Sequence, residues 1–348
     1  MSKVLCSKPT AMNVPKNLWS PKRSIYVPLA FLSVIFWGCK KESTSPNDKT
    51  PSVTTIGISL ITDSTAVSGG NISSDGGASV ASRGVCWATT NVPTIANNKT
   101  SDGDGVGNFT SRLYDLTPNT KYYVRAYATN SKGTSYGEEI SFTSSESTTG
   151  TMNDIDGNVY KTVKINGVWW MAENLKTTRY RNGDSIPNMT NGFQWATAVS
   201  GGYCNHDNNP ANSDVYGRLY NWFAVSDGRK LAPAGWHIPT SSEWQTLVDG
   251  NGGRYLAGGK LKETGNLHWI TPNHGATDAV GFRALPGGNR NDAAGFFNKG
   301  INGYWWTSTE ITGAGSFGVH FSMYTNTAYC ENANADKHMG FSVRCVKD

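Results

Sequence analysis

The sequence predicts two β-rich folded regions, an all-β sandwich followed by a second domain that contains both strands and helices. Three observations predict this arrangement. The chain has 348 residues, which is long enough for two domains. Residues 53–145 contain six short strand signals separated by glycine-containing turns, as in β-sandwiches. Beyond residue 151 the composition changes, because most of the tryptophans lie there and helical patterns appear between strand signals.

The first 38 residues have the pattern of an export signal. Lys22 and Arg23 precede the apolar run 25–37, and Gly38 and Cys39 follow it. A basic segment, a short apolar segment and a small residue at the cleavage point are typical of a secretory signal peptide. The run is too short for a comfortable membrane-spanning helix. An uncleaved N-terminal anchor with an incidental cysteine is the alternative interpretation.

This segment resembles a bacterial lipoprotein signal, in which Cys39 becomes the lipidated N-terminus. The resemblance implies a protein of the cell envelope that is held by its lipid at the outer membrane and exposed on the surface. Residues 39–52 are rich in serine, threonine, lysine and proline, and they predict a flexible tether.

The charge distribution argues against nucleic acid as a partner. Five of the 31 basic residues lie in residues 1–38, which contain no acidic residue. The rest of the chain therefore carries as many basic as acidic residues. A neutral body generates no broad field that attracts phosphates.

The sharpest signal in residues 53–145 is the segment 116–130. Leu116 and Pro118 precede Tyr122, and alternating residues then predict a strand with one apolar face. The segment resembles a fibronectin type III module, where a leucine–x–proline turn and a following tyrosine form the corner between the two sheets. The resemblance implies a spacer domain.

Residues 146–151 predict a linker, and two hairpins follow it. Asp156-Gly157 and Asn166-Gly167 are typical two-residue hairpin turns. Two helices are expected further on, at 219–225 and 241–249. Thr240 or Ser241 can cap the second helix, and Glu243 completes a capping box.

Seven motifs in residues 152–348 occur in a specific order. They resemble the Fibrobacter succinogenes major paralogous (FISUMP) domain of exported lipoproteins from Bacteroidetes and Fibrobacteres. They are Tyr160–Ile165, Trp169–Leu175, Tyr216–Trp222, Gly235–Trp244, Phe282–Arg290, Tyr304–Thr309 and Ser342–Val346. More distantly, the segments around His237 and Arg344 resemble the C-type-lectin-like and formylglycine-generating-enzyme folds. That resemblance implies a compact α+β domain whose N- and C-terminal strands pair.

The residues argue against an enzyme. The formylglycine-generating enzymes use a reactive cysteine pair, whereas Cys86, Cys204, Cys330 and Cys345 contain no closely spaced pair. No zinc-ligand spacing and no Gly-x-Ser-x-Gly motif occurs. In an exported protein such cysteines favour disulfides. We favour Cys204–Cys345, although three pairings of the four cysteines are open to the sequence.

One loop has the residues of a calcium site. Asn205, Asp207, Asn209 and Asp214 supply the densest cluster of oxygen ligands in the chain. Calcium takes six to eight such oxygens. Turns rich in asparagine and aspartate also occur without metal, so a solvated turn is the alternative.

Aromatic residues are the best argument for a binding function. Sugar rings stack on aromatic side chains, and five residues are candidates for such stacking, namely Trp169, Trp195, Trp269, Tyr304 and Trp305. Since paired tryptophans on a strand point to opposite faces, one of each pair is expected in the core. The alternative is that most of them fill the core. Arg283, Arg290 and Arg344 are expected to bind backbone carbonyls within turns.

The sequence therefore predicts a surface protein that binds or adheres, with polysaccharide as the first candidate ligand and no required cofactor. A structural component that recognises protein partners on the cell surface is the alternative. An enzyme related to the formylglycine-generating fold is the third interpretation.

Overall fold

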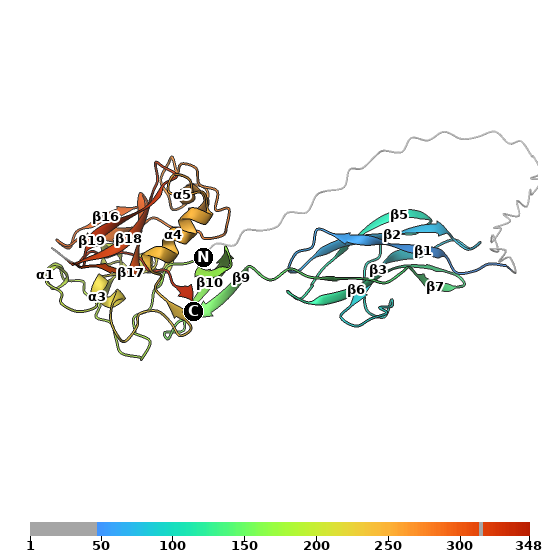
Figure 1. Ribbon diagram of the computed structural model, residues 1–348, viewed down its shortest axis with the longest axis horizontal. Helices are drawn as coiled ribbons and strands as arrows, with labels where there is room; N and C mark the ends of the chain where they lie inside the picture. Colours follow the sequence, from blue (N-terminus) through green and yellow to red (C-terminus); the bar gives the residue numbers. More distant parts are fainter. Residues whose placement is uncertain (1–46, 313–315) are drawn as a thin grey trace, which may run out of the picture. The chain divides into compact units, whose positions relative to one another are not determined.

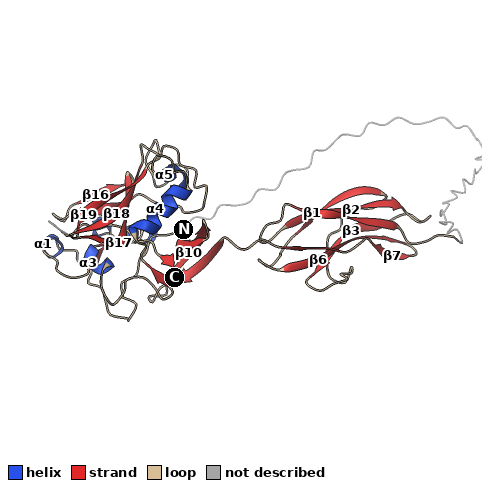
Figure 2. Ribbon diagram, viewed as in Figure 1, coloured by secondary structure: helices blue, strands red, loops and turns tan. Residues whose placement is uncertain are grey.

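The computed structural model describes residues 47–312 and 316–348, and its two folded regions are shown in Figures 1 and 2. The predicted signal peptide 1–38, the lipidation site Cys39 and most of the predicted tether lie outside these residues. Among the helices of the described ranges, none combines the length and apolar character needed to cross a bilayer.

The first region is a sandwich of two antiparallel sheets. One sheet has the strand order β1-β2-β5, and the other has β4-β3-β6-β7 with β8 paired to β6. These strands are β1 (Ser52–Ser59), β2 (Ala66–Ser74), β3 (Ser82–Ala88), β4 (Asn98–Lys99), β5 (Gly107–Leu113), β6 (Lys121–Asn130), β7 (Gly133–Tyr136) and β8 (Ile140–Thr143).

The corner between the sheets has the predicted form. Leu116 and Tyr122 are buried in the sandwich core with the inward residues of both sheets. The Tyr122 hydroxyl accepts a 2.8 Å hydrogen bond from the backbone N–H of Thr117. The sandwich also begins earlier than expected, since the Lys49 N–H donates to Gly76 and the Lys49 carbonyl accepts from Asn130. The predicted tether therefore ends before Lys49.

The second region is built from several small sheets. Its largest sheet has the order β14-β20-β11-β10-β9, a three-stranded sheet has the order β17-β18-β19, and two hairpins are β12-β13 and β15-β16. The strands are β9 (Thr149–Asn153), β10 (Val159–Ile165), β11 (Val168–Met171), β12 (Tyr203–Cys204), β13 (Leu219–Tyr220), β14 (Trp236–His237), β15 (Gly287–Arg290), β16 (Phe296–Lys299), β17 (Asn302–Ile311), β18 (Phe317–Tyr324), β19 (Cys330–Asp336) and β20 (Val346–Lys347).

The two ends of this domain meet in its largest sheet. Trp170 of β11 pairs with Val346 of β20, so the C-terminal strand joins the sheet of the first three strands, although its partner is β11 and not the N-terminal strand β9. The predicted turns at 156–157 and 166–167 join β9 to β10 and β10 to β11. The predicted linker 146–151 is shorter than expected, because Thr149 already begins β9.

The helices are short. They are α1 (Gly192–Ala196), the 3-10 turn η1 (His206–Asn208), α2 (Pro210–Tyr216), α3 (Trp222–Val225), α4 (Ser241–Gly250) and α5 (Ala257–Leu261). Helix α4 confirms the prediction, because Thr240 is its N-cap and forms a capping box with Glu243. The helix predicted at 219–225 is wrong in its first half. Leu219 and Tyr220 pair with β12, and the Asn221 side chain then caps α3.

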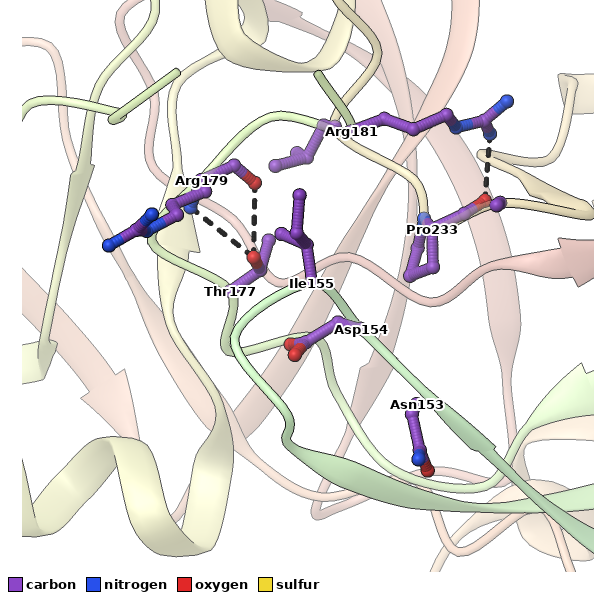
Figure 3. A pocket seen from close by; sticks show the side chains of 9 residues that line it. Asn153, Asp154, Ile155, Thr177, Arg179, Arg181 and Pro233 are labelled. Carbon is purple, nitrogen blue, oxygen red and sulfur yellow. Dashed lines mark hydrogen bonds between the residues drawn. The ribbon is translucent and has the colours of Figure 1, made fainter. Parts of the chain in front are cut away.

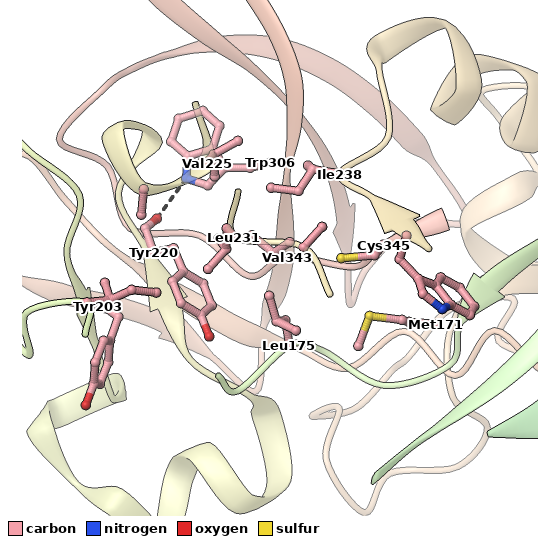
Figure 4. Close-up of a cluster of buried hydrophobic side chains, with 14 of the residues drawn as sticks. Met171, Leu175, Tyr203, Tyr220, Val225, Leu231, Ile238, Trp306, Val343 and Cys345 are labelled. Carbon is pink, nitrogen blue, oxygen red and sulfur yellow. Dashed lines mark hydrogen bonds between the residues drawn. The ribbon is translucent and has the colours of Figure 1, made fainter. Parts of the chain in front are cut away.

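The domain is mostly β, and it has two main hydrophobic clusters. Strand β17 contributes to both, since Trp305 belongs to one cluster and Trp306 to the other. Figure 4 shows the cluster that contains Trp306, to which Tyr220, Leu231 and Val343 also belong. The expected α+β lectin-like topology stays a prediction, because the longest helix has only ten residues.

Candidate ligand-binding site

Three of the five predicted stacking residues have no exposed surface. Trp195, Trp269 and Trp305 are 0% exposed. The indole N–H of Trp269 donates to the Ala284 carbonyl at 2.9 Å, and that of Trp305 donates to Asn174 Oδ1 at 2.8 Å. A ring enclosed by protein cannot stack on a sugar. The prediction of a binding role is wrong for these three, which form the core.

Trp169 and Tyr304 are partly buried and pack against the hydrophobic cluster of Figure 4. Tyr304 stacks on Phe341 with ring centroids 5.1 Å apart, so one face of its ring is covered. We expected one tryptophan of each adjacent pair to lie in the core. This holds for the first pair, in which Trp170 is buried and Trp169 is partly buried. It fails for Trp305 and Trp306, which are both buried because side chains pack on both faces of β17.

The predicted Cys204–Cys345 disulfide is wrong. Within the described residues all four cysteines are buried free thiols. Cys204 packs with Trp195 and Leu219, whereas Cys345 belongs to a different cluster. Burial raises the pKa of the Cys204 thiol to about 12, against the smaller opposing effect of Arg290. The thiols therefore behave as small neutral core residues.

The predicted calcium loop does not converge on a metal site. Across residues 47–312 and 316–348, no three histidine, cysteine or acidic side chains are grouped to hold a metal ion. Lys299 Nζ lies 2.9 Å from Asp207 Oδ2 and 3.3 Å from Asn212 Oδ1, so an ammonium group already neutralises the carboxylate. The Asn209 side chain caps α2, Asp214 is exposed on that helix, and Asn205 is buried before η1.

Two depressions lie side by side on the second domain and share Arg181 and Leu231. The first has a volume of about 270 Å³ and is shown in Figure 3. The turn after β9 supplies its floor, where Ile155 is 49% exposed, and Leu231 and Pro233 add apolar wall. Arg179 and Arg181 extend to opposite sides of it (Figure 3).

The second depression has a volume of about 250 Å³. Its lining combines apolar residues of the 225–238 segment with the polar groups of Lys230, His237, Ser308 and Asp348. Apolar residues make up about half of each lining, and the other residues are polar or charged. Apolar wall together with convergent polar groups is a feature of ligand-binding sites.

Arg181 is fixed by the backbone between the two depressions. Its Nε donates to the Ala232 carbonyl at 2.9 Å, and its Nη2 donates to the carbonyls of Pro233 at 2.8 Å and Trp236. These carbonyls belong to a single turn before β14. The guanidinium is therefore held in one orientation by three bonds, which lowers the entropy lost when it binds a ligand.

His237 lies in the second depression between two carboxylates. Its Nε2 is 2.9 Å from Glu243 Oε1, and its Nδ1 is 2.7 Å from Asp348 Oδ1. Partial burial alone would lower the pKa of His237, but the hydrogen bonds to the two carboxylates outweigh it and raise the pKa. Because both ring nitrogens are engaged, this histidine is not arranged as a general base.

A family model, described as the Fibrobacter succinogenes major domain, matches residues 163–347. That match covers more than half of the chain. The chain belongs to this family. The matched range thus includes both depressions except for the turn at residues 153–155 in the first and Asp348 in the second.

Comparison with curated proteins gave no match. Among the solved structures that resemble the chain, two match about a third of its length or less. The sensor domain of the anti-sigma factor RsgI4 of Pseudobacteroides cellulosolvens is 13% identical with a TM-score of 0.22, covering 28% of this chain and 98% of that one. The third fibronectin III domain of human KIAA0343 protein is 15% identical with a TM-score of 0.22, covering 32% and 95%. Such low scores carry no argument, and the description of the sandwich rests on its strand pairing.

Most residues that line the depressions carry no recognisable signal in the sequence. Arg179, Arg181 and Lys230 lie in segments without regular secondary structure, and Asp348 reaches His237 across 111 positions. The only available signal was the Gly235–Trp244 motif, which identified the position of His237 but not its partners. Of the three arginines expected to bind carbonyls, Arg290 and Arg344 do so. Arg283 instead pairs with Glu263 at 2.8 Å.

Proposed function

We propose that this protein is a surface lipoprotein whose major domain binds polysaccharide in the two depressions that meet at Arg181. The observation that carries the proposal is the pair of adjacent depressions, each with an apolar wall and a fixed polar group. Sugar units present apolar C–H faces and hydroxyl groups together. Ile155, Leu231 and Pro233 suit the former, and Arg181 suits the latter.

The remainder of the chain supports display at the surface. In this proposal Cys39 carries the lipid anchor in the outer membrane, and the tether and sandwich separate the major domain from the bilayer. Lipidation at an N-terminal cysteine with several acyl chains gives stable anchoring. The proposed role is binding without catalysis, since both nitrogens of His237 already serve carboxylates.

The proposal is tested by retention of the purified protein on soluble and insoluble polysaccharides. We expect Ile155→Ala to weaken retention several-fold, because it removes apolar contact from the first depression. Val159→Ala is the matched control, since Val159 is 57% exposed and outside both depressions. A chelator should have no effect, because Lys299 occupies the place of a cation beside Asp207. No retention on any polysaccharide would overturn the proposal and favour a protein partner.

A further inference from the structure

We propose that the ligand is an acidic polysaccharide and that Arg181 binds its carboxylate. This inference rests on the proposed function and names the chemical class of the ligand. It follows from the cationic side chains of the two depressions, whose hydrogen-bond donors are only partly used.

The donors of Arg181 are only partly used. A guanidinium has five N–H groups, and Nε and Nη2 of Arg181 are bonded to the turn before β14. Nη1 has no hydrogen bond to any of residues 47–312 or 316–348, and over the same residues Arg181 makes no ion pair. A cation held by carbonyls alone and facing a depression is suited to an anionic ligand.

Both carboxylates that line the depressions, those of Asp154 and Asp348, already take part in hydrogen bonds. The Asp154 carboxylate accepts from the N–H groups of Asp156 and Asn158, from the Asn158 amide and from the Tyr160 hydroxyl, at 2.5–2.9 Å. Asp348 is bonded to His237. A ligand that carries carboxylates would therefore meet the free donors of Arg181 beside two carboxylates that are already engaged.

Two further cations lie at the depressions. Arg179 lines the first, and only its Nε approaches a carboxylate, Asp156 at 3.3 Å. Lys230 lines the second, is exposed, and forms no ion pair with any described residue. Arg179 is thus paired with Asp156, whereas Arg181 and Lys230 have no carboxylate partner among the described residues. Arg181 lines both depressions and Lys230 lines the second, so an acidic chain that crosses both would meet two unpaired cations.

The shape favours a sugar polymer over an acidic peptide. At about 270 and 250 Å³ each depression is smaller than an ordinary drug-sized site, and the two are adjacent. Consecutive sugar units can occupy them in turn, with carboxylates at Arg181 and Lys230. A flexible peptide would lose more conformational entropy on entering both depressions.

The test uses the whole protein and four polymers: polygalacturonate, its fully methyl-esterified form, neutral galactan and polyglutamate. Affinity is measured by calorimetry at low and high salt. We expect binding of polygalacturonate that is at least tenfold tighter than binding of the ester, and that weakens with salt. Arg181→Gln should reduce the affinity for polygalacturonate roughly tenfold.

Variants separate a binding role from a structural one. Arg181→Gln also removes bonds to the turn, so Lys230→Asn is the second variant. Lys230 has φ 67°, which asparagine tolerates, and we expect a loss of about threefold. Arg112→Ala in β5 is the control, because it removes an exposed charge from the sandwich.

The outcomes distinguish the two proposals. Equal affinity for polygalacturonate and its methyl-esterified form would overturn the proposal that the ligand is acidic, and it would leave the proposal of polysaccharide binding intact. Absence of binding to all three polysaccharides would overturn both. Equal or tighter binding of polyglutamate, with the same loss in Arg181→Gln, would overturn the sugar and assign the site to an acidic peptide.

Discussion

The sandwich and the major domain satisfy their buried polar groups in different ways. The buried polar residues of the sandwich are uncharged, namely Ser68, Ser111, Asn130 and Ser144. Those of the major domain include Lys262, Arg290 and Arg344 as well as acidic residues. In the described chain, buried lysine and arginine are therefore found in the second region alone.

The difference follows from the amount of regular structure. Most backbone groups of the sandwich are paired in long antiparallel ladders. The major domain has long segments without helix or strand, such as 262–286. Their carbonyls must find other donors when they are buried. Arg344 supplies such bonds to Phe282 and Arg283, and Lys262 Nζ supplies them to His274, Tyr324 and Thr327.

The largest effect is expected when a buried donor is removed from the major domain. Arg344→Met keeps apolar contact with Phe282 but leaves the carbonyls of Phe282 and Arg283 without their donor and removes one of the two donors to Asn174 Oδ1. We expect the free energy of unfolding of this domain to fall by about 4 kcal/mol. Urea unfolding followed by tryptophan fluorescence measures this change. The signal reports mainly on the major domain, because Trp87 is the only tryptophan in residues 47–148.

Arg112→Met provides the comparison in the sandwich. Arg112 is exposed, so we expect a change within about 0.5 kcal/mol. If Arg344→Met changed the stability as little as Arg112→Met, the dependence of the irregular segments on buried cations would be refuted.

A second difference concerns acid, because the major domain also buries a neutral histidine. His320 packs among Tyr304, Trp306 and Phe341, and burial lowers its pKa to about 4. The unfolded chain takes up this proton near pH 6.5, so the folded state loses stability as the pH falls from 6.5 to 4. We expect a loss of about 2–3 kcal/mol in that interval.

His320→Phe isolates this contribution. The variant should show a flatter dependence of unfolding free energy on pH between 6.5 and 4, whereas the exposed His274→Gln should follow the native protein. The titration of carboxylates contributes equally to the pH dependence of all three proteins. The contribution of His320 is therefore the difference between the curve of the native protein and the curve of His320→Phe. Parallel curves for His320→Phe and the native protein would show that His320 is not neutral in the fold.

The same contrast explains what could be predicted from the sequence. The corner at Tyr122, the two hairpin turns and the capping box of α4 were predicted because each depends on residues within a few positions. The family was also recognisable, because its motifs are short and ordered.

The site could not be predicted, because its contacts join distant segments without regular structure. Arg181 meets carbonyls more than fifty positions away, and His237 meets Asp348. The aromatic prediction failed for a related reason. A strand with one exposed face leaves one of two adjacent tryptophans free, but β17 is covered on both faces by segments that no local pattern revealed.

A smaller effect is expected at the corner of the sandwich. Tyr122→Phe removes the acceptor for the Thr117 N–H and should lower the stability of the sandwich by about 1 kcal/mol. Hydrogen exchange of sandwich amides, read by mass spectrometry, measures this independently of the major domain. Tyr123→Phe is the control, because no hydrogen bond of its hydroxyl is present in the described structure. Equal exchange in the two variants would mean that the hydroxyl bond at the corner contributes nothing.

An effect of similar size is expected at the start of α4, which carries an N-terminal capping box. The Thr240 hydroxyl accepts from the Glu243 N–H, and Glu243 Oε2 accepts from the Thr240 N–H at 2.7 Å. Thr240→Ala should lower the free energy of unfolding by about 1 kcal/mol. Thr246→Ala, at an exposed position inside the helix, should leave it unchanged or raise it slightly, because alanine favours helix. If both variants were equally stable to urea, the cap would be irrelevant and α4 would be held by the packing of Trp244 and Leu247 alone.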